Sequence, residues 1–290
     1  MTTSVVTPAT TRERAEPRLI GVVARKVLRE AVRDRWFWLY CLGFAVLAGT
    51  LATVAVPDDG LVGPGGFGRT AASLVALVQL VIPLMALTLG ARSLAAERET
   101  GSLRFLLSQP VSRSEVLLGT WLGLAASLFT AVAAGFGAAG IVSSLQSSPV
   151  DTAILLRIAG LSFLLSLAML SVGMVISVST RRTSTAMGTG LFVWLVLVFL
   201  GDLGLMGTTI ATRLPVETLF FSVMVNPVES FRLASIVSLD ASLDALGPAG
   251  SYAVDTYGDS IGGIAVGVVV LWTAAALFAS WLIFRRRSDV

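Results

Sequence analysis

Few side chains in this sequence could act as a nucleophile, a general base or a metal ligand. The 290 residues contain no His and one Cys, Cys41, and Lys26 is the single Lys. Zinc or copper sites built from His and Cys are therefore excluded, as is a disulfide within the chain. A phosphate-binding P-loop needs Gly-x-x-x-x-Gly-Lys-(Ser/Thr), whereas Lys26 stands in Ala-Arg-Lys-Val. The sequence thus predicts no catalytic residue, no metal site and no cofactor bound by this chain.

The most distinctive charged stretch is residues 97–113, hereafter the 97–113 segment. It reads Glu-Arg-Glu-Thr-Gly-Ser-Leu-Arg, continues after Phe105 with Leu-Leu-Ser-Gln-Pro, and ends at Arg113. Apolar stretches long enough to cross a bilayer flank it on both sides. Ser112 and Glu115 are spaced as a capping box, which predicts that a helix begins directly after the segment. Such a helix would transmit a push on the segment as a rigid rod. The alternative interpretation of the 97–113 segment is an ordinary solvated loop.

The composition predicts an integral membrane protein of the all-α class. Hydrophobic residues make up 55% of the chain and charged residues 13%, and the mean hydropathy is +0.84. No soluble domain of this length could place so much apolar surface in water. A helix needs about 20 apolar residues to cross roughly 30 Å of hydrocarbon. Six runs meet this length and predict a six-helix transmembrane bundle: about 36–56, 71–91, 116–142, 154–177, 187–206 and 261–284.

The distribution of Lys and Arg predicts the orientation of the chain. These residues gather before the first span, between the second and third, between the fourth and fifth, and after the sixth. Because cationic residues stay on the cytoplasmic side, both termini and the 97–113 segment are expected in the cytoplasm. Residues 1–17 read as a flexible cytoplasmic tail. Residues 18–35 read as a basic amphipathic helix on the lipid surface, in which Lys26 can pair with Glu30, or alternatively as a solvated basic helix.

The longest stretch on the external side, about 207–260, is predicted to form re-entrant or interfacial helices before the last span. It contains an apolar piece too short to cross, a break at Asn226-Pro227, and then an amphipathic run. The external acids, Glu229 among them, are expected to be mostly solvated. The region would either cap the external mouth or act as a substrate gate.

Two Gly-x-x-x-Gly pairs give small-residue faces on which helices can approach closely. They lie in the third and sixth predicted spans, and they predict helix packing within the subunit or a dimer seam. The four residues are Gly119, Gly123, Gly263 and Gly267.

The 97–113 segment resembles the cytoplasmic coupling segment of ABC-2 type transporter permeases. That family's pattern reads roughly Glu-Arg-Glu-x-Gly-(Ser/Thr)-Leu, then Leu-Leu-(Ser)-x-Pro, then Ser-Arg and a new membrane helix. Nearly every element stands here in order. The resemblance extends over nearly the whole chain, including the interfacial helix and the external helices. Asn-Pro followed by Phe-Arg is similar to the multicopper-enzyme-maturation permease subgroup, which makes these the external gate candidates: Asn226, Pro227, Phe231 and Arg232.

The resemblance implies a transmembrane permease domain over residues 36–290, placed in the cell membrane. Its partners would be a separate ABC ATPase subunit, which uses ATP and Mg²⁺, and a second copy or a related permease; nucleic acid is not expected. The charged residues 97–99 would contact the ATPase, and Gly101 would permit a sharp turn or a close backbone approach. The leucines would fill a groove of the ATPase or anchor the segment on the bundle. The implied coupling residues are Glu97, Arg98, Glu99, Gly101, Leu103, Leu106, Leu107, Pro110 and Arg113.

The function so predicted is that of the permease subunit of an ATP-driven exporter. A non-transporting membrane anchor or scaffold that recruits an ATPase or a maturation partner would use the 97–113 segment equally well. An intramembrane enzyme would have few groups for general base work, since no His, no in-span carboxylate pair and no Ser-Lys dyad is present. The substrate stays open, although the lack of His argues against direct copper handling.

Overall fold

Helices make up all of the regular structure in the described part of the chain. The computed structural model describes residues 16–54, 64–145, 152–210, 224–238 and 258–286. The predicted tail therefore lies almost wholly outside the described residues. Four helices are long and apolar enough to cross a bilayer, judged by length and composition. They are α3 (Pro64–Glu99), α5 (Arg113–Leu145), α6 (Thr152–Ser179) and α11 (Ile261–Arg286).

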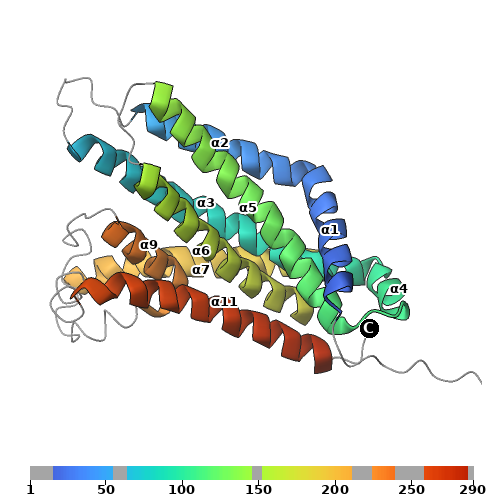
Figure 1. Cartoon of the computed structure of the whole chain (residues 1–290). Helices are drawn as coiled ribbons and strands as arrows, with labels where there is room; N and C mark the ends of the chain where they lie inside the picture. Colours follow the sequence, from blue (N-terminus) through green and yellow to red (C-terminus); the bar gives the residue numbers. More distant parts are fainter. Residues whose placement is uncertain (1–15, 55–63, 146–151, 211–223, 239–257, 287–290) are drawn as a thin grey trace, which may run out of the picture.

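Two further apolar helices complete the bundle, α2 (Arg35–Val54) and α7 (Thr183–Ile210). Their described apolar stretches, Phe37–Leu51 and Thr183–Phe199, are shorter than those of the other four. The six helices lie alongside one another in Figure 1, with α1 (Pro17–Arg33) at an angle to α2. The prediction of an all-α membrane protein is confirmed, whereas six complete spans stay a prediction.

α3 and α6 cross with their backbones in contact. A Cβ atom built on Gly90 would stand 2.6 Å from the Leu170 carbonyl oxygen, and one built on Gly173 would stand 2.7 Å from the Leu87 carbonyl oxygen. Side chains cannot occupy such spaces, so the two glycines let the helix backbones touch. This pair lies outside the Gly-x-x-x-Gly spacing, and the sequence did not single it out.

The first predicted glycine pair, Gly119 and Gly123, lies between α5 and α1. Added Cβ atoms would stand 2.6 Å from the Cβ of Val23 and 2.8 Å from the Cβ of Val27. α1 is amphipathic: Val23, Val27 and Ala31 are buried against the bundle. Its arginines are exposed, namely Arg18, Arg25, Arg29 and Arg33. The glycine pair therefore seats the amphipathic helix on α5 within one chain.

The second predicted pair, Gly263 and Gly267, lies on the exposed side of α11. An added Cβ atom at either position meets no described atom within 4 Å. The pair makes no close contact with the described parts of its own chain. A seam with a second copy stays a prediction.

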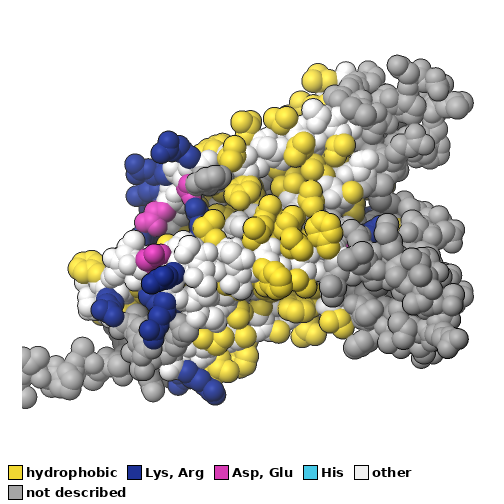
Figure 2. Space-filling view, turned by 180° about the vertical axis from the view of Figure 1, so that it is seen from behind, with side chains coloured by type: hydrophobic (Ala, Val, Ile, Leu, Met, Phe, Trp, Pro, Cys, Tyr) yellow, Lys and Arg dark blue, Asp and Glu magenta, His cyan; other side chains and the backbone are white. Residues whose placement is uncertain are grey.

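The two ends of the bundle differ in chemistry. Charged side chains gather at the end that carries α4 (Ser102–Ser108), called the α4 end, and apolar side chains cover the middle (Figure 2). The opposite, distal end holds α9 (Pro227–Ser238), which packs against α11 and α6. A short 3₁₀ turn, η2 (Gly258–Ser260), precedes α11 there. An apolar belt beside a cationic end is the surface expected of a membrane-embedded chain.

The substitution Gly90→Ala tests the α3–α6 crossing. The new methyl group would meet the Leu170 carbonyl oxygen, so we expect the free energy of unfolding to fall by about 1–3 kcal/mol. Gly188 of α7 is the matched control, because it is exposed and an added Cβ meets no described atom within 4 Å. Gly188→Ala should leave stability unchanged or raise it by up to about 1 kcal/mol through helix propensity. Thermal unfolding in one detergent measures both, and equal stability of the two variants would contradict the close crossing.

Candidate functional site

The 97–113 segment forms the junction between α3 and α5 at the α4 end. Residues 97–99 are the last turn of α3, and Gly101 then redirects the chain into α4. Gly101 has φ of +78°, in the left-handed region that glycine adopts without strain. The hydroxyl groups of Thr100 and Ser102 both donate to the carbonyl oxygen of Glu97, at 3.3 and 3.1 Å. These bonds fix a sharp turn directly after the charged residues.

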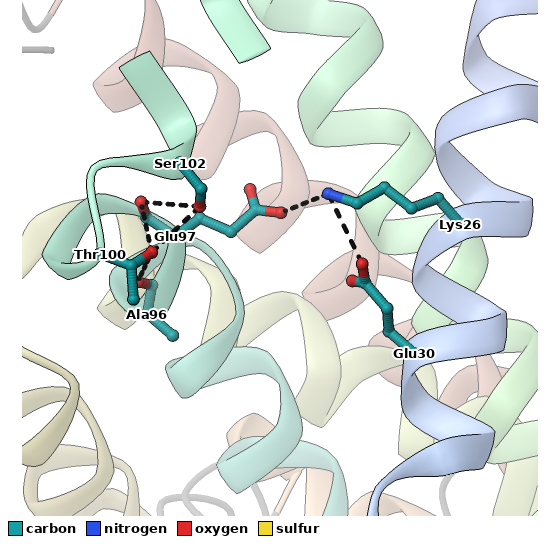
Figure 3. A network of polar contacts seen from close by, with 6 residues as sticks. All are labelled: Lys26, Glu30, Ala96, Glu97, Thr100 and Ser102. Carbon is teal, nitrogen blue, oxygen red and sulfur yellow. Dashed lines mark hydrogen bonds and ion pairs between the residues drawn. The ribbon is translucent and has the colours of Figure 1, made fainter. Parts of the chain in front are cut away.

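Glu97 connects this turn to α1. Its carboxylate lies 3.3 Å from the ammonium group of Lys26, which also lies 3.8 Å from Glu30, the partner that the helical spacing predicted. Figure 3 shows Lys26 between the two carboxylates. A second ion pair, between Arg92 of α3 and Asp34 at the end of α1, joins the same helices. Partly exposed ion pairs contribute little to stability, but these two set the position of α1 against α3.

Arg98 and Glu99 bind the ends of two further helices. The Arg98 guanidinium donates to the carbonyl oxygens of Thr180 and Ser177, at 2.5 and 3.4 Å, where α6 ends. The Glu99 carboxylate accepts the backbone N–H of Thr183 at 2.9 Å, where α7 begins. A cation at a helix C-terminus and an anion at an N-terminus both complement the helix dipole. All three charges that were expected to contact an ATPase, Glu97, Arg98 and Glu99, thus have partners within the chain.

α4 has one face on the bundle and one in solvent. Leu103 is fully buried in an apolar cluster of α3, α5, α6 and α11, and Leu106 and Leu107 pack partly buried against that cluster. Phe105 points the other way and is 72% exposed. The structure therefore places the three leucines on the bundle and presents Phe105 outward.

The last part of the segment holds α5 and α11. The backbone N–H of Ser112 donates to the Glu115 carboxylate at 2.7 Å, and the Glu115 N–H donates to the Ser112 hydroxyl at 3.2 Å. This is the predicted capping box, and the helix start that it predicted is confirmed at Arg113. The Arg113 guanidinium donates to the carbonyl oxygen of Phe284 at 3.1 Å, near the end of α11. Pro110 is exposed just before these contacts.

The segment is therefore the place where the ends of several helices are joined. Its polar side chains contact α1, α6, α7 and α11, and its two ends continue into α3 and α5. Among the residues that the structure describes, no group of three or more possible metal ligands occurs. The geometry of this site suits the transfer of a displacement between helices.

The external gate candidates lie at the start of α9, at the distal end. The side-chain oxygen of Asn226 accepts the backbone N–H of Val228 at 3.0 Å, and its amide donates to the Leu197 carbonyl oxygen of α7 at 2.6 Å. Pro227 occupies the first helical position, where a missing N–H is harmless. Phe231 is buried at 1% exposure. These residues are packed into the bundle rather than spread over its surface.

The expectation that Glu229 is solvated is wrong. This residue of α9 is 1% exposed, and its carboxylate accepts a hydrogen bond from the amide of Gln79 of α3 at 3.1 Å. The guanidinium of Arg232, the fourth gate candidate, lies 3.8 Å from the same carboxylate. A buried charge is strongly unfavourable unless it is paired and hydrogen-bonded, and Gln79 and Arg232 meet this need. α9 is thereby attached to α3 through a polar contact inside the bundle.

The sequence analysis did not identify Phe105 or Glu229 as candidate functional residues. Only the exposure of Phe105 could have been predicted from the sequence. Helical spacing places Leu103, Leu106 and Leu107 on one face of a short helix, so Phe105 must face away from them. For Glu229 no such signal exists, because its burial depends on how α9 folds back against a helix 150 positions earlier in the chain.

A basic end where several apolar helices meet around one exposed short helix is compatible with a membrane subunit that binds a cytoplasmic partner. The chain belongs to the ABC-2 family, since the model described as "ABC-2 family transporter protein" matches residues 22–288. The resemblance seen in the 97–113 segment is thus confirmed. Permeases of this family lack an ATPase motif of their own and imply an ATPase partner.

Two relatives are similar over almost their full length, and both are described as a probable ABC transporter permease protein NosY. The relative from Pseudomonas aeruginosa is 32% identical over 276 residues, which cover 93% of this chain and 98% of that protein. The relative from Stutzerimonas stutzeri is 31% identical over 277 residues, which cover 91% of this chain and 97% of that protein.

The substitution Arg98→Gln tests the contact between α3 and α6. It removes charge-assisted hydrogen bonds at the C-terminus of α6, so we expect the free energy of unfolding to fall by about 1.5–3 kcal/mol. Arg104→Gln is the matched control, because Arg104 is an exposed arginine of α4. Thermal unfolding of the two purified variants gives the comparison. A melting temperature of Arg98→Gln as high as that of Arg104→Gln would remove the structural role assigned to Arg98.

Proposed function

We propose that this chain is the permease subunit of an ATP-driven ABC-2 exporter, in which the 97–113 segment transmits the motion of a separate ATPase subunit to the membrane helices. The observation that carries the proposal is that α4 has one exposed face and one face buried against the bundle. Phe105 is open to a partner, while Leu103 on the other face is fully buried. A partner that moves Phe105 must therefore move the bundle.

The charged α4 end is assigned to the cytoplasm. Nearly all described Lys and Arg side chains lie at that end, whereas Arg157 and Arg232 lie toward the distal end. Cationic residues remain on the cytoplasmic side of membrane proteins. An ATPase that uses cytoplasmic ATP and Mg²⁺ would meet the chain there, and the six apolar helices would each cross the membrane.

Phe105 is the proposed anchor in the ATPase. Buried aromatic side chains dominate many protein interfaces because they remove a large apolar area from water when they enter a pocket. Phe105 is followed by Leu106 and Leu107, which are only partly buried, so a partner that binds Phe105 would also shield their exposed atoms. Arg104 is exposed beside it and supplies charge at the rim.

From α4 the displacement would travel by the contacts at helix ends. Arg98 and Glu99 transfer it to α6 and α7, Glu97 to α1, and Arg113 to α11. Helices that are bound at their ends move as rigid bodies rather than by bending. Two chains, either two copies or a pair of related permeases, would open a pathway between them when their ATPases close.

At the distal end, the same motion would displace α9. The Gln79–Glu229 contact attaches α9 to α3, and Asn226 attaches it to α7. A relative shift of α3 and α7 would strain one of these contacts. We therefore assign a gating role to Asn226, Pro227, Phe231 and Arg232.

A membrane anchor that recruits an ATPase without moving a substrate is the second candidate. It would also need Phe105, but it would not need contacts that carry a displacement on to α1. The two candidates are separated by variants that keep ATPase binding and lose coupling.

The substitution Phe105→Ala tests the proposed docking. Because Phe105 is 72% exposed, its loss should change the stability of the permease by no more than about 0.5 kcal/mol. Co-purification of the co-expressed ATPase should fall sharply, since an interface anchor contributes about 2 kcal/mol or more. Phe192→Ala, at 67% exposure on α7, is the control and should leave co-purification intact. Undiminished ATPase recovery with Phe105→Ala would refute the assignment.

A charge exchange between Lys26 and Glu97 tests the transfer to α1. We expect Glu97→Lys to lower the ATPase activity of the reconstituted complex, because two ammonium groups would repel each other across the contact. The double variant Glu97→Lys with Lys26→Glu should restore activity, as a pairwise interaction requires. Failure of the second change to rescue the first, with ATPase co-purification lost, would instead place Glu97 in the ATPase interface.

A further inference from the structure

A second site lies between α5 and α6, in the distal half of the bundle and away from the 97–113 segment. A cavity of about 740 Å³ opens there, within the roughly 300–1,000 Å³ typical of small-molecule sites. Its walls are almost entirely apolar. Side chains that line it are exposed at the surface of the bundle, including Ile141 at 63% and Leu156 at 67%. The cavity therefore faces the membrane rather than the interior of the bundle.

The cavity is long. The α5 wall runs from Phe129 to Ser144, a rise of about 22 Å at 1.5 Å per residue. One leaflet has roughly 15 Å of hydrocarbon, so the cavity is long enough to hold an acyl chain along its length. The rings of Phe129 and Phe163 meet edge to face at 5.3 Å between centroids, and both line the cavity. The hydroxyl-bearing residues Ser144 and Thr152 line the mouth.

Two glycines keep the cavity open. Gly137 of α5 and Gly160 of α6 both line it, and an added Cβ atom at either position meets no described atom within 4 Å. The absence of side chains at these positions is therefore not required by the packing of the bundle. It leaves room that no side chain of the described residues fills.

A cationic side chain stands beside the cavity. A smaller hollow of about 530 Å³ shares Leu156, Gly160 and Phe163 with it and contains Arg157. Arg157 is exposed and lies more than one turn inside α6, where a charge in contact with lipid is unfavourable without a partner. Helical side chains lean toward the helix N-terminus, so Arg157 extends toward the distal surface. Guanidinium groups bind phosphate oxygens in a bidentate manner.

We propose that the α5–α6 cavity binds one phospholipid of the distal leaflet, with an acyl chain in the cavity and the headgroup phosphate on Arg157. The length, the apolar walls and the polar mouth match the acyl chain, and the guanidinium matches the phosphate. The site does not depend on ATPase coupling. The lipid occupies the space between the distal halves of α5 and α6, two helices whose other ends contact the 97–113 segment.

Native mass spectrometry of the full chain tests the site. The protein in mild detergent is titrated with palmitoyl-oleoyl phosphatidylglycerol, and one retained lipid per chain is expected. Gly160→Leu and Gly137→Leu fill the cavity from opposite walls and should abolish retention. Gly43→Leu is the control, because Gly43 is exposed on α2 and an added Cβ meets no described atom within 4 Å. Arg157→Gln should weaken retention roughly tenfold or more, the loss of a charge-assisted hydrogen bond.

Each other outcome overturns the proposal. Equal retention by the two cavity-filling variants and Gly43→Leu means that lipid binds elsewhere. A change from dimer to monomer in those variants means that a second copy fills the cavity. Full retention by Arg157→Gln removes the phosphate contact. Should the filled variants fail to fold, a diazirine-bearing phosphatidylglycerol on the unaltered protein must label residues 129–144 and 152–163, and labelling confined to other helices refutes the site.

Discussion

The contact of two backbones at Gly90 and Gly173 is the constraint on which the rest of the structure depends. It brings α3 and α6 together so closely that, one turn farther on, the backbone N–H of Ala95 donates to the Ser177 hydroxyl at 2.9 Å. From there the guanidinium of Arg98 reaches the carbonyl groups at the end of α6. A side chain at either glycine would separate the helices and remove these contacts. The contacts of the 97–113 segment with α6 are therefore a consequence of helix packing inside the apolar bundle.

Within the 97–113 segment, the contacts with the bundle and the proposed docking of a partner involve different residues. The charged side chains of residues 97–99 contact the ends of α6 and α7 and the ammonium group of Lys26, and at the helix ends they complement the helix dipoles. Phe105 does not take part in these contacts with helix ends and is exposed. A motif with several charges thus presents an aromatic ring to its proposed partner, and the charges keep that ring rigidly attached to the membrane helices.

At the distal end, polar side chains likewise need partners, because they lie among apolar helices or face lipid. A polar group among apolar helices must find a partner within the chain or bring one in. Glu229 finds Gln79 and Arg232, and α9 becomes part of the bundle. Arg157 stands on the lipid-facing side beside an open cavity, and the proposed phospholipid supplies its counter-charge.

The sequence by itself determined what depends on neighbouring residues and on composition. Apolar runs predicted the membrane helices, the spacing of Ser112 and Glu115 predicted the start of α5, and the pattern of the 97–113 segment indicated the ABC-2 family. Only the tertiary structure decided what depends on residues far apart in the chain. It placed Gly90 against Gly173 at a backbone contact, gave the charges of residues 97–99 partners on other helices, and buried Glu229. The reason is that hydropathy and capping are local, whereas the partner of a charge is set by which helix ends meet in space.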